Sequence, residues 1–404
     1  MTTPDSLPIV PRPGDAIVKL SPGAENILGR MTSDILDLAH ATAIKGARFK
    51  IGAYELREAD YQQILLWAQA LALPPLTVIT HLANSVCKKN LNVDPSESDI
   101  LFALDDGAIT SLAWDFKKLP LNNFRWVTGL RVKQLGFTGR PASSPALALH
   151  LPFLSVLSCR VTSLTELDLS NVPALTELYC SNNQLTELDL SHVPALTKLD
   201  CWENQLDELD LSNVPALTVL ACTENPLTEL DLSHVPALTK LDCRSNQLTE
   251  LDLSNVPALT ELYCWGNQLT ELDLSNVPAL TVLACTENPL TELDLSHVPA
   301  LTALYCWGNQ LTELDLSNVP ELTVLNCSDN QLTELDLSNV PALTVLNCVR
   351  NHLTELDLSN VPALTALYCL DNQLTTLDIR KLSNLGSFLH DPQLVIKKRK
   401  AQNI

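Results

Sequence analysis

Cysteine side chains recur along this chain at a fixed spacing, and their chemistry is the first feature that needs an explanation. Eleven of the twelve cysteines stand 21 residues apart, from Cys159 to Cys369. Thiols at such a spacing could form disulfides, bind a metal or fill an interior column. Free cysteine is among the most often buried residue types, which favours the interior column. Disulfides or a metal stay open as the alternative, and reduced thiols would indicate a reducing, cytoplasmic compartment.

Aromatic and arginine side chains form a second candidate site. They occupy positions 5 and 7 of a 21-residue unit, LTxLxCxxNxLTELDLSxVPA, counted from its first Leu. These two positions change freely between units, although the segment LTELDLSxVPA hardly changes. Trp, Tyr and Arg are the side chains that most often supply binding energy at protein interfaces. We therefore expect these residues to bind a protein partner, and the alternative is that the rings only pack on one another. The candidates are Tyr179, Trp202, Arg244, Tyr263, Trp265, Tyr305, Trp307 and Tyr368.

Carboxylates are repeated in the same way. Ten units contain a Glu and an Asp in the segment LTELDL, and these residues explain most of the net charge of −21. A charge of this sign disfavours nucleic acid and anionic membranes as partners. The acidic columns are expected to keep the protein soluble, and binding of a basic partner or a divalent cation is the alternative. Intervening units argue against a metal site shared by the three histidines at position 18, His192, His234 and His297.

A stacked repeat must position all of these side chains. Eleven units of the pattern LTxLxCxxNxLTELDLSxVPA run in register from Leu154 to about residue 385. Along a short extended segment, positions 1, 4 and 6 point inward and positions 3, 5 and 7 point outward. The Asn at position 9, from Asn183 to Asn372, is expected to satisfy backbone groups at a turn. A fixed period of this length predicts a solenoid.

This pattern resembles the leucine-rich repeat family, and within it the bacterial 21-residue type whose units read LTxLxCSxNxLTxLDLSxN. The resemblance is strong over residues 154–385 and weak over 109–153, and VPA stands where many such units have a second Asn. It implies a curved solenoid with a parallel β-sheet on the concave face, a convex side of extended segments or short strands, and a protein-binding role. With the α-helical region that precedes the repeats, this is the fold class that we expect.

The N-terminal region, residues 1–105, is expected to be a helical cap or docking region. The apolar spacing predicts a helix whose buried face contains Tyr61, Leu65, Leu66 and Ala70. The predicted elements are helices over 23–42, 56–73 and 76–87, a short strand or loop over 48–56, and a connector over 94–107. The helix over 76–87 contains the one cysteine outside the repeats, Cys87.

Weaker copies of the repeat are expected at both ends of the stack. Residues 106–153 contain two degenerate units in which Trp114 and Phe137 replace Cys, and stacks need atypical units to seal their ends. Residues 386–404 are expected to form a C-terminal cap and a basic tail, Lys397–Lys400. A solvated tail is the simpler reading of that segment, and a signal for targeting or for an anionic partner is the alternative.

The leading hypothesis is a non-catalytic scaffold that binds a protein partner on the concave face. The sequence contains no recognisable catalytic constellation, phosphate loop or metal motif, so we expect no catalytic residues, no metal and no cofactor. The runner-up is a bacterial effector of the repeat-plus-ubiquitin-ligase layout that lacks its usual catalytic domain, or an adaptor in a larger complex. Without a signal peptide or membrane span, the expected location is cytoplasmic, with a secreted effector that has no cleaved signal as the alternative.

Overall fold

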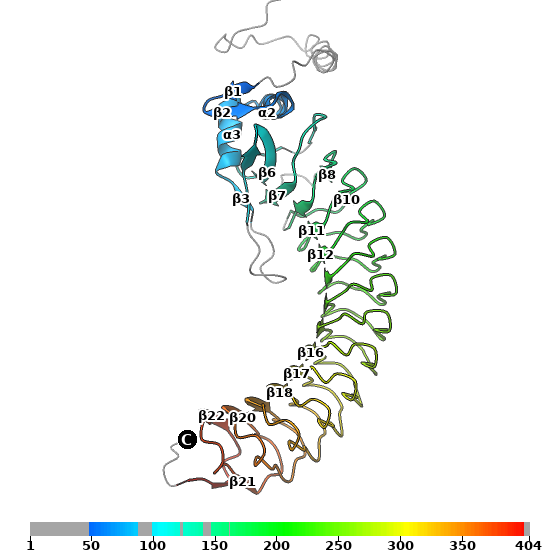
Figure 1. Ribbon diagram of the computed structural model, residues 1–404, viewed down its shortest axis with the longest axis vertical. Helices are drawn as coiled ribbons and strands as arrows, with labels where there is room; N and C mark the ends of the chain where they lie inside the picture. The colour runs from blue at the N-terminus through cyan, green and yellow to red at the C-terminus, as the bar shows by residue number, and fades with distance from the viewer. Residues whose placement is uncertain (1–47, 88–98, 122–123, 140–146, 161, 400–404) are drawn as a thin grey trace, which may run out of the picture. The chain divides into compact units, whose positions relative to one another are not determined.

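The computed structural model describes residues 48–87, 99–121, 124–139, 147–160 and 162–399 (Figure 1). The chain divides into two compact units, Met1–Arg48 and Phe49–Ile404, and every element below belongs to the second unit. The helix predicted over 23–42 lies outside the described residues.

A 15-stranded sheet forms the backbone of the second unit. Its order is β22-β20-β19-β18-β17-β16-β15-β14-β13-β12-β11-β9-β7-β6-β5, so neighbours in the sequence are neighbours in the sheet. All pairs are parallel except β5–β6, which is antiparallel. The strands are β5 Ala103–Asp105, β6 Ala108–Asp115, β7 Gln134–Thr138, β9 Val156–Ser158, β11 Glu177–Tyr179, β12 Lys198–Asp200, β13 Val219–Ala221, β14 Lys240–Asp242, β15 Glu261–Tyr263, β16 Val282–Ala284, β17 Ala303–Tyr305, β18 Val324–Asn326, β19 Val345–Asn347, β20 Ala366–Tyr368 and β22 Ser387–Leu389.

Each regular unit contributes one three-residue strand and returns through turns. In the first complete unit, Val172 donates its N–H to the carbonyl of Leu169, and Leu175 donates to Val172. Pro173 lies inside the second of these turns, where its fixed φ fits and no ladder donor is required. Two short parallel pairs lie outside the main sheet, β8 Leu147–Ala148 with β10 Leu167–Asp168, and β21 Thr376–Asp378 with β23 Val395–Lys397. The fold is the parallel β-solenoid that the repeat predicted.

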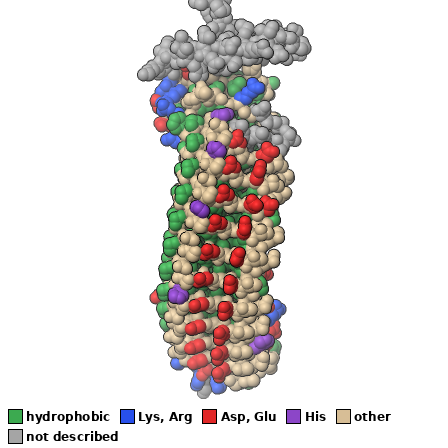
Figure 2. All heavy atoms as spheres, turned by 90° about the vertical axis from the view of Figure 1, so that its right-hand side faces the viewer, with side chains coloured by type: hydrophobic (Ala, Val, Ile, Leu, Met, Phe, Trp, Pro, Cys, Tyr) green, Lys and Arg blue, Asp and Glu red, His purple; other side chains and the backbone are tan. Residues whose placement is uncertain are grey.

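The strands line one side of the stack, the inner side of the curve drawn by the repeats in Figure 1. Viewed from the opposite side, the repeats show rows of Asp and Glu side chains (Figure 2). We call the surface formed by positions 3, 5 and 7 of the units the strand face, and the opposite surface the acidic face.

The N-terminal end of the stack is covered by helices and hairpins. This region contains the hairpin of β1 Phe49–Ile51 and β2 Tyr54–Leu56, helices α2 Glu58–Leu71 and α3 Pro75–Ala83, and the antiparallel pair β3 Val86–Cys87 and β4 Ile100–Leu101. Trp67 of α2 packs edge-on against Trp114 of β6, with ring centroids 5.0 Å apart. Trp114 and Phe137 are buried and face each other in the β6–β7 register, so they continue the cysteine column with larger side chains.

Three predictions for this region are wrong. Helix α2 buries Asp60, Gln63, Ile64, Trp67 and Ala68, whereas Ala70 is exposed and Tyr61, Leu65 and Leu66 are only half-buried. Cys87 belongs to a strand because α3 ends at Ala83, and residues 100–105 form β4 and β5 instead of a connector. In the described part of the chain, no single helix is long and apolar enough to cross a membrane; α2 and α3 together reach that length, with a bend of 106°.

Candidate functional site

The interior of each unit is filled by the residues that the repeat predicted to be inward. Leu at positions 1 and 4 and Cys at position 6 are fully buried in the regular units, as Leu259, Leu262 and Cys264 illustrate. All twelve cysteines, which all lie in the described residues, are free and buried, so the disulfide alternative is wrong. Burial raises the pKa of Cys285 to about 12. The thiols of the column are therefore protonated and poorly nucleophilic, as expected of structural cysteines.

The Asn at position 9 ties adjacent units together, which confirms its predicted role. Asn267 donates its side-chain amide to the carbonyl oxygens of Cys264 in its own unit and Cys243 in the preceding unit, at 2.9 and 3.1 Å. Its side-chain oxygen accepts the N–H of Leu248 at 3.1 Å. Buried polar backbone groups in the turn are thereby satisfied.

The residue before each Asn has a left-handed backbone conformation. Its φ is positive in the described units, for example +50° at Glu287 and +68° at Gly266. Glycine tolerates this conformation, but most units place Glu, Asp, Asn, Ser or Arg here. For residues other than Gly, Asn and Asp, this conformation costs about 1 kcal/mol or more.

The strand face presents the predicted partner-binding residues unevenly. Tyr179 is fully buried, which contradicts its assignment to an exposed surface. The other seven candidates are half-buried, with rings or charged groups that remain in contact with solvent. Lys240 and Arg244 lie 5.4 and 5.9 Å from the ring of Tyr263, and Arg244 lies 5.5 Å from the ring of Trp265. The residues from β14 to β15 thus form one contiguous polar and aromatic cluster.

The pair β3–β4 covers the N-terminal end of the strand face, and this explains the burial of Tyr179. Cys87 and Ile100 form a small apolar cluster with Ala113, Val156 and Tyr179, which all project from the strand face. The Cys87 thiol donates to the hydroxyl oxygen of Ser158 at 3.4 Å. A Cβ built on Gly136 would lie 2.5 Å from the Cβ of Cys87, so a glycine is required for this close approach. Strands β6 to β11 are therefore already covered by the chain itself.

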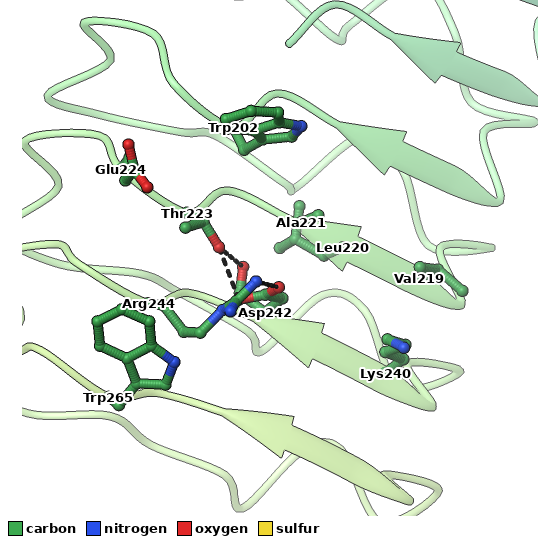
Figure 3. Close-up of a pocket in the computed structure, with 10 residues that line it drawn as sticks. All are labelled: Trp202, Val219, Leu220, Ala221, Thr223, Glu224, Lys240, Asp242, Arg244 and Trp265. Atoms are coloured by element: carbon green, nitrogen blue, oxygen red, sulfur yellow. Dashed lines mark hydrogen bonds and ion pairs between the residues drawn. The ribbon is translucent and has the colours of Figure 1, made fainter. Parts of the chain in front are cut away.

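Beyond the covered strands lies a pocket of about 120 Å³. Trp202 and Trp265 lie at its two ends, Ala221, Thr223, Asp242 and Arg244 lie between them, and Lys240 lies to one side (Figure 3). The floor belongs to the unit that starts at Leu217, whose 21 residues are identical to those of the unit that starts at Leu280.

Asp242 holds Arg244 in place within this pocket. Its two carboxylate oxygens accept the Nε–H and an Nη2–H of Arg244 at 2.5 and 2.6 Å, and Oδ1 also accepts the hydroxyl of Thr223 at 2.6 Å. Lys240 forms an ion pair of 2.8 Å with Glu261. A guanidinium fixed by two hydrogen bonds and stacked near an indole loses little conformational entropy when it binds a further group.

Sequence reasoning included Trp202, Arg244 and Trp265 but missed Thr223, Lys240 and Asp242. The available signal was the distribution of basic residues. All four Lys and Arg residues between Leu154 and Val349 lie at position 3 or 7: Arg160, Lys198, Lys240 and Arg244. Cations gathered on one face of a strongly acidic stack give that face a different electrostatic potential from the rest of the surface.

The acidic face has a structural explanation for one of its two columns. Asp252 accepts the backbone N–H of Ser254 at 2.8 Å through Oδ1, and this bond recurs in every regular unit. Hydrogen bonds from the backbone and hydroxyl of Ser254 lower the pKa of Asp252. The Glu at position 13 is exposed in each of the ten units that contain it. Among the described residues, no group of three His, Cys, Asp or Glu side chains is placed to hold a metal ion.

Comparison with known proteins agrees with this geometry. Residues 173–213, 236–276 and 299–339 match the family described as Leucine Rich repeats (2 copies). No curated protein matches the sequence. The functional domain of InlJ from Listeria monocytogenes, which includes a cysteine ladder, is 40% identical with a TM-score of 0.58 over 59% of this chain. The match spans 54% of the InlJ chain, so this protein covers about half of that relative's length.

Two further solved structures share the architecture. YopM from Yersinia enterocolitica is 29% identical, with a TM-score of 0.53 over 69% of each chain. A leucine-rich repeat protein from Leptospira interrogans is 24% identical, with a TM-score of 0.61 over 66% of this chain and 74% of its own, which shows the fold alone. The fold is one that proteins commonly use as an interaction scaffold. The repeats of this chain are leucine-rich repeats of the bacterial 21-residue type, stacked on a cysteine ladder.

Proposed function

We propose that this protein is a non-catalytic scaffold and that it binds a protein partner on the uncovered part of the strand face, from β12 to β20. One observation carries the proposal: rings at positions 5 and 7 stay half-exposed on β15 and β17 and the turns that follow them. These rings are Tyr263, Trp265, Tyr305 and Trp307. Between them lie Ala284 and Thr286, which are small and buried. Large rigid rings beside small residues are typical of the centre of a protein interface.

The repeat itself does not require these rings. The leucines, the cysteine, the Asn and the Asp at position 15 each have a packing or hydrogen-bonding role in every unit. Units with Asn326 or Asn347 at position 5 keep the same strand pairing as units with Tyr. The aromatic residues are thus available for recognition, and their removal is expected to leave the stack intact.

The experiment compares the full chain with two double variants. A partner captured by the wild-type chain is identified by mass spectrometry, purified and titrated calorimetrically. Trp265→Ala with Trp307→Ala should weaken its binding by about 2 kcal/mol or more per ring. The matched control, Glu271→Gln with Glu313→Gln, changes two exposed residues on the acidic face and should bind normally. Unchanged affinity of the tryptophan variant, together with a lower melting temperature, would mean that the rings serve packing only.

We also propose that the protein works in a reducing, cytoplasmic compartment, as its twelve free cysteines suggest. Intact-mass measurement of protein isolated from its native cells, with alkylation during lysis, tests this directly. Twelve alkyl groups after unfolding agree with the proposal, and any disulfide pair in the native sample contradicts it.

A further inference from the structure

The pocket between Trp202 and Trp265 has a charge pattern that selects among possible ligands. Two cations, Lys240 and Arg244, and two carboxylates, Asp242 and Glu224, line it. The carboxylates are not equally available. The Asp242 side chain is only 15% exposed and already accepts three hydrogen bonds, whereas Glu224 is exposed and lies at the side of the pocket away from Lys240 (Figure 3).

The cations keep unused donors. A guanidinium has five N–H groups, and Asp242 accepts two of those of Arg244. The side chains of Arg244 and Lys240 are 32% and 26% exposed. Glu261 holds the Lys240 ammonium at 2.8 Å, but an ammonium has three donors. The pocket between Trp202 and Trp265 therefore offers donors of Arg244 and Lys240, the acceptors of Asp242 are occupied, and Glu224 lies at the side.

The size of the pocket limits the ligand to about one side chain. A volume of about 120 Å³ is well below the roughly 300 Å³ at which small-molecule sites begin. A cationic side chain would meet Lys240 and Arg244 at once, whereas the Asp242 carboxylate is already paired and Glu224 lies at the side of the pocket. A purely apolar side chain would cover the free donors of Arg244 without replacing their hydrogen bonds to water, which is unfavourable.

We propose that this pocket binds the carboxylate of an Asp or Glu side chain of the protein partner, with Arg244 and Lys240 as the hydrogen-bond donors. The proposal rests on the proposed function and names the chemistry that its partner supplies. Asp242 is a positioning residue, because it fixes the plane of the guanidinium toward the pocket. Charge-assisted hydrogen bonds to a pre-oriented guanidinium are among the stronger polar contacts in proteins.

The test observes the six tryptophan indoles of the full chain by 15N–1H NMR, assigned with single Trp→Phe variants. The probes are three blocked peptides, acetyl-Gly-Glu-Gly-amide, acetyl-Gly-Lys-Gly-amide and acetyl-Gly-Leu-Gly-amide. The Glu peptide should shift the signals of Trp202 and Trp265 saturably. Trp307, which lies outside the pocket lining, and the buried Trp67 serve as internal controls and should not move.

Variants then assign the donors. Arg244→Gln should lower the affinity for the Glu peptide about tenfold or more, and Lys240→Gln should lower it severalfold. Lys198→Gln is the matched control, because Lys198 occupies the same unit position two strands earlier and does not line the pocket. Melting curves of all variants check folding, and Asp242→Asn, which keeps the side-chain volume, provides a second way to loosen Arg244. Salt should weaken binding of the Glu peptide.

Three results would overturn the proposal: no indole shift with the Glu peptide up to about 50 mM, an equal or larger effect of the Lys or Leu peptide, or unchanged binding in Arg244→Gln. These failures are distinguishable from failure of the proposed function. A partner that still depends on Trp265 and Trp307 would leave the strand face as its binding surface and remove only the assignment of a carboxylate to this pocket.

Discussion

At the scale of single residues, the Asn column explains why the period holds so strictly. Asn288 is 4% exposed, and its side chain bonds to the carbonyls of Cys264, Cys285 and Thr286 and to the N–H of Leu269. No other side chain of this size offers donors and an acceptor in the same arrangement. Each Asn therefore fixes the turn of its own unit and the spacing to the unit before it.

Replacing this residue should be costly. We predict that Asn288→Ala lowers the free energy of unfolding by about 3 kcal/mol, because several buried backbone groups lose their partner. Asn276→Ala is the control, since Asn276 is exposed and bonds only to the hydroxyl of Ser275 among the contacts seen. It should change stability by less than about 0.5 kcal/mol in urea unfolding. Equal effects of the two variants would show that the column is dispensable.

Two kinds of aspartate give the protein opposite responses to pH. Burial raises the pKa of Asp200 to about 7, although Arg160 acts in the opposite direction. Because the folded state prefers the protonated form, stability should increase as the pH falls from about 7 toward the unfolded value near 4. Hydrogen bonds from Ser191 lower the pKa of Asp189, and hydrogen bonds from the serine two residues on lower the pKa of Asp231 and Asp273 in the same way. Their stabilisation is present above pH 4 and lost below it.

The predicted profile of unfolding free energy therefore has its maximum between about pH 4 and 5. Asp200→Asn should stabilise the protein at pH 8 and reduce the slope between pH 5 and 8. Asp207→Asn removes the same charge at an exposed position and controls for the relief of general repulsion in this acidic chain. A slope that is reduced equally by both variants would argue against the burial of Asp200 as its cause.

At the scale of elements, the repeat could be predicted almost completely and the N-terminal region only in part. Leu and Cys at inward positions repeat eleven times, so period and direction are unambiguous. In α2 the buried face includes Asp60, whose carboxylate accepts the N–H of Ile109, and Gln63, which bonds to the backbone of Arg125 and Val127. Asp60 and Gln63 are buried because they form hydrogen bonds with backbone groups far away in the sequence. Such polar residues do not contribute to the spacing of apolar residues along the helix, so this spacing indicated the wrong face.

The candidate site, too, could be predicted from the sequence only in part. The sequence places Trp202, Arg244 and Trp265 on the strand face because their unit positions point outward. It cannot show that Tyr179 is covered, because the covering strands β3 and β4 lie far from it in sequence and contain two residues each. It also does not reveal that Asp242 orients Arg244, since Asp at position 5 is accompanied by Trp202 in one unit and by Arg244 in another.

The contact of β3–β4 with the strand face can be tested through one glycine. Gly136→Ala places a Cβ where Cys87 already lies, and we predict a loss of about 2 kcal/mol of stability or displacement of the pair. Displacement should expose Cys87 and increase its rate of alkylation, which mass spectrometry follows residue by residue. Gly386→Ala is the control, because its Cβ would meet only a carbonyl oxygen at 3.9 Å. Unaltered Cys87 reactivity together with unaltered stability in Gly136→Ala would contradict this packing.

At the scale of the whole molecule, each unit is held mainly by its two neighbours, so opening should proceed from the ends. The cysteine ladder can be used to follow this opening, because every regular unit contains one thiol in a similar buried environment. We predict that pulsed alkylation in moderate urea labels Cys369 first and Cys264 much later. Cys369 is at the end of the ladder beside β22, whereas Cys264 has several units on both sides. Simultaneous labelling of all eleven thiols would indicate a single cooperative unit.

The identity of the units has a consequence for how the chain finds its fold. Because the register partners of neighbouring regular strands are 21 residues apart and two whole units are identical, a growing stack could accept the wrong neighbour and leave one or more units looped out. The hydrogen bonds of such a misaligned stack would be almost as good as the native ones. The aromatic cluster at Trp67, Trp114 and Phe124 occurs once, so it supplies a unique starting point. Folding that begins there and adds units in order avoids the ambiguity, whereas folding that begins among the central repeats does not.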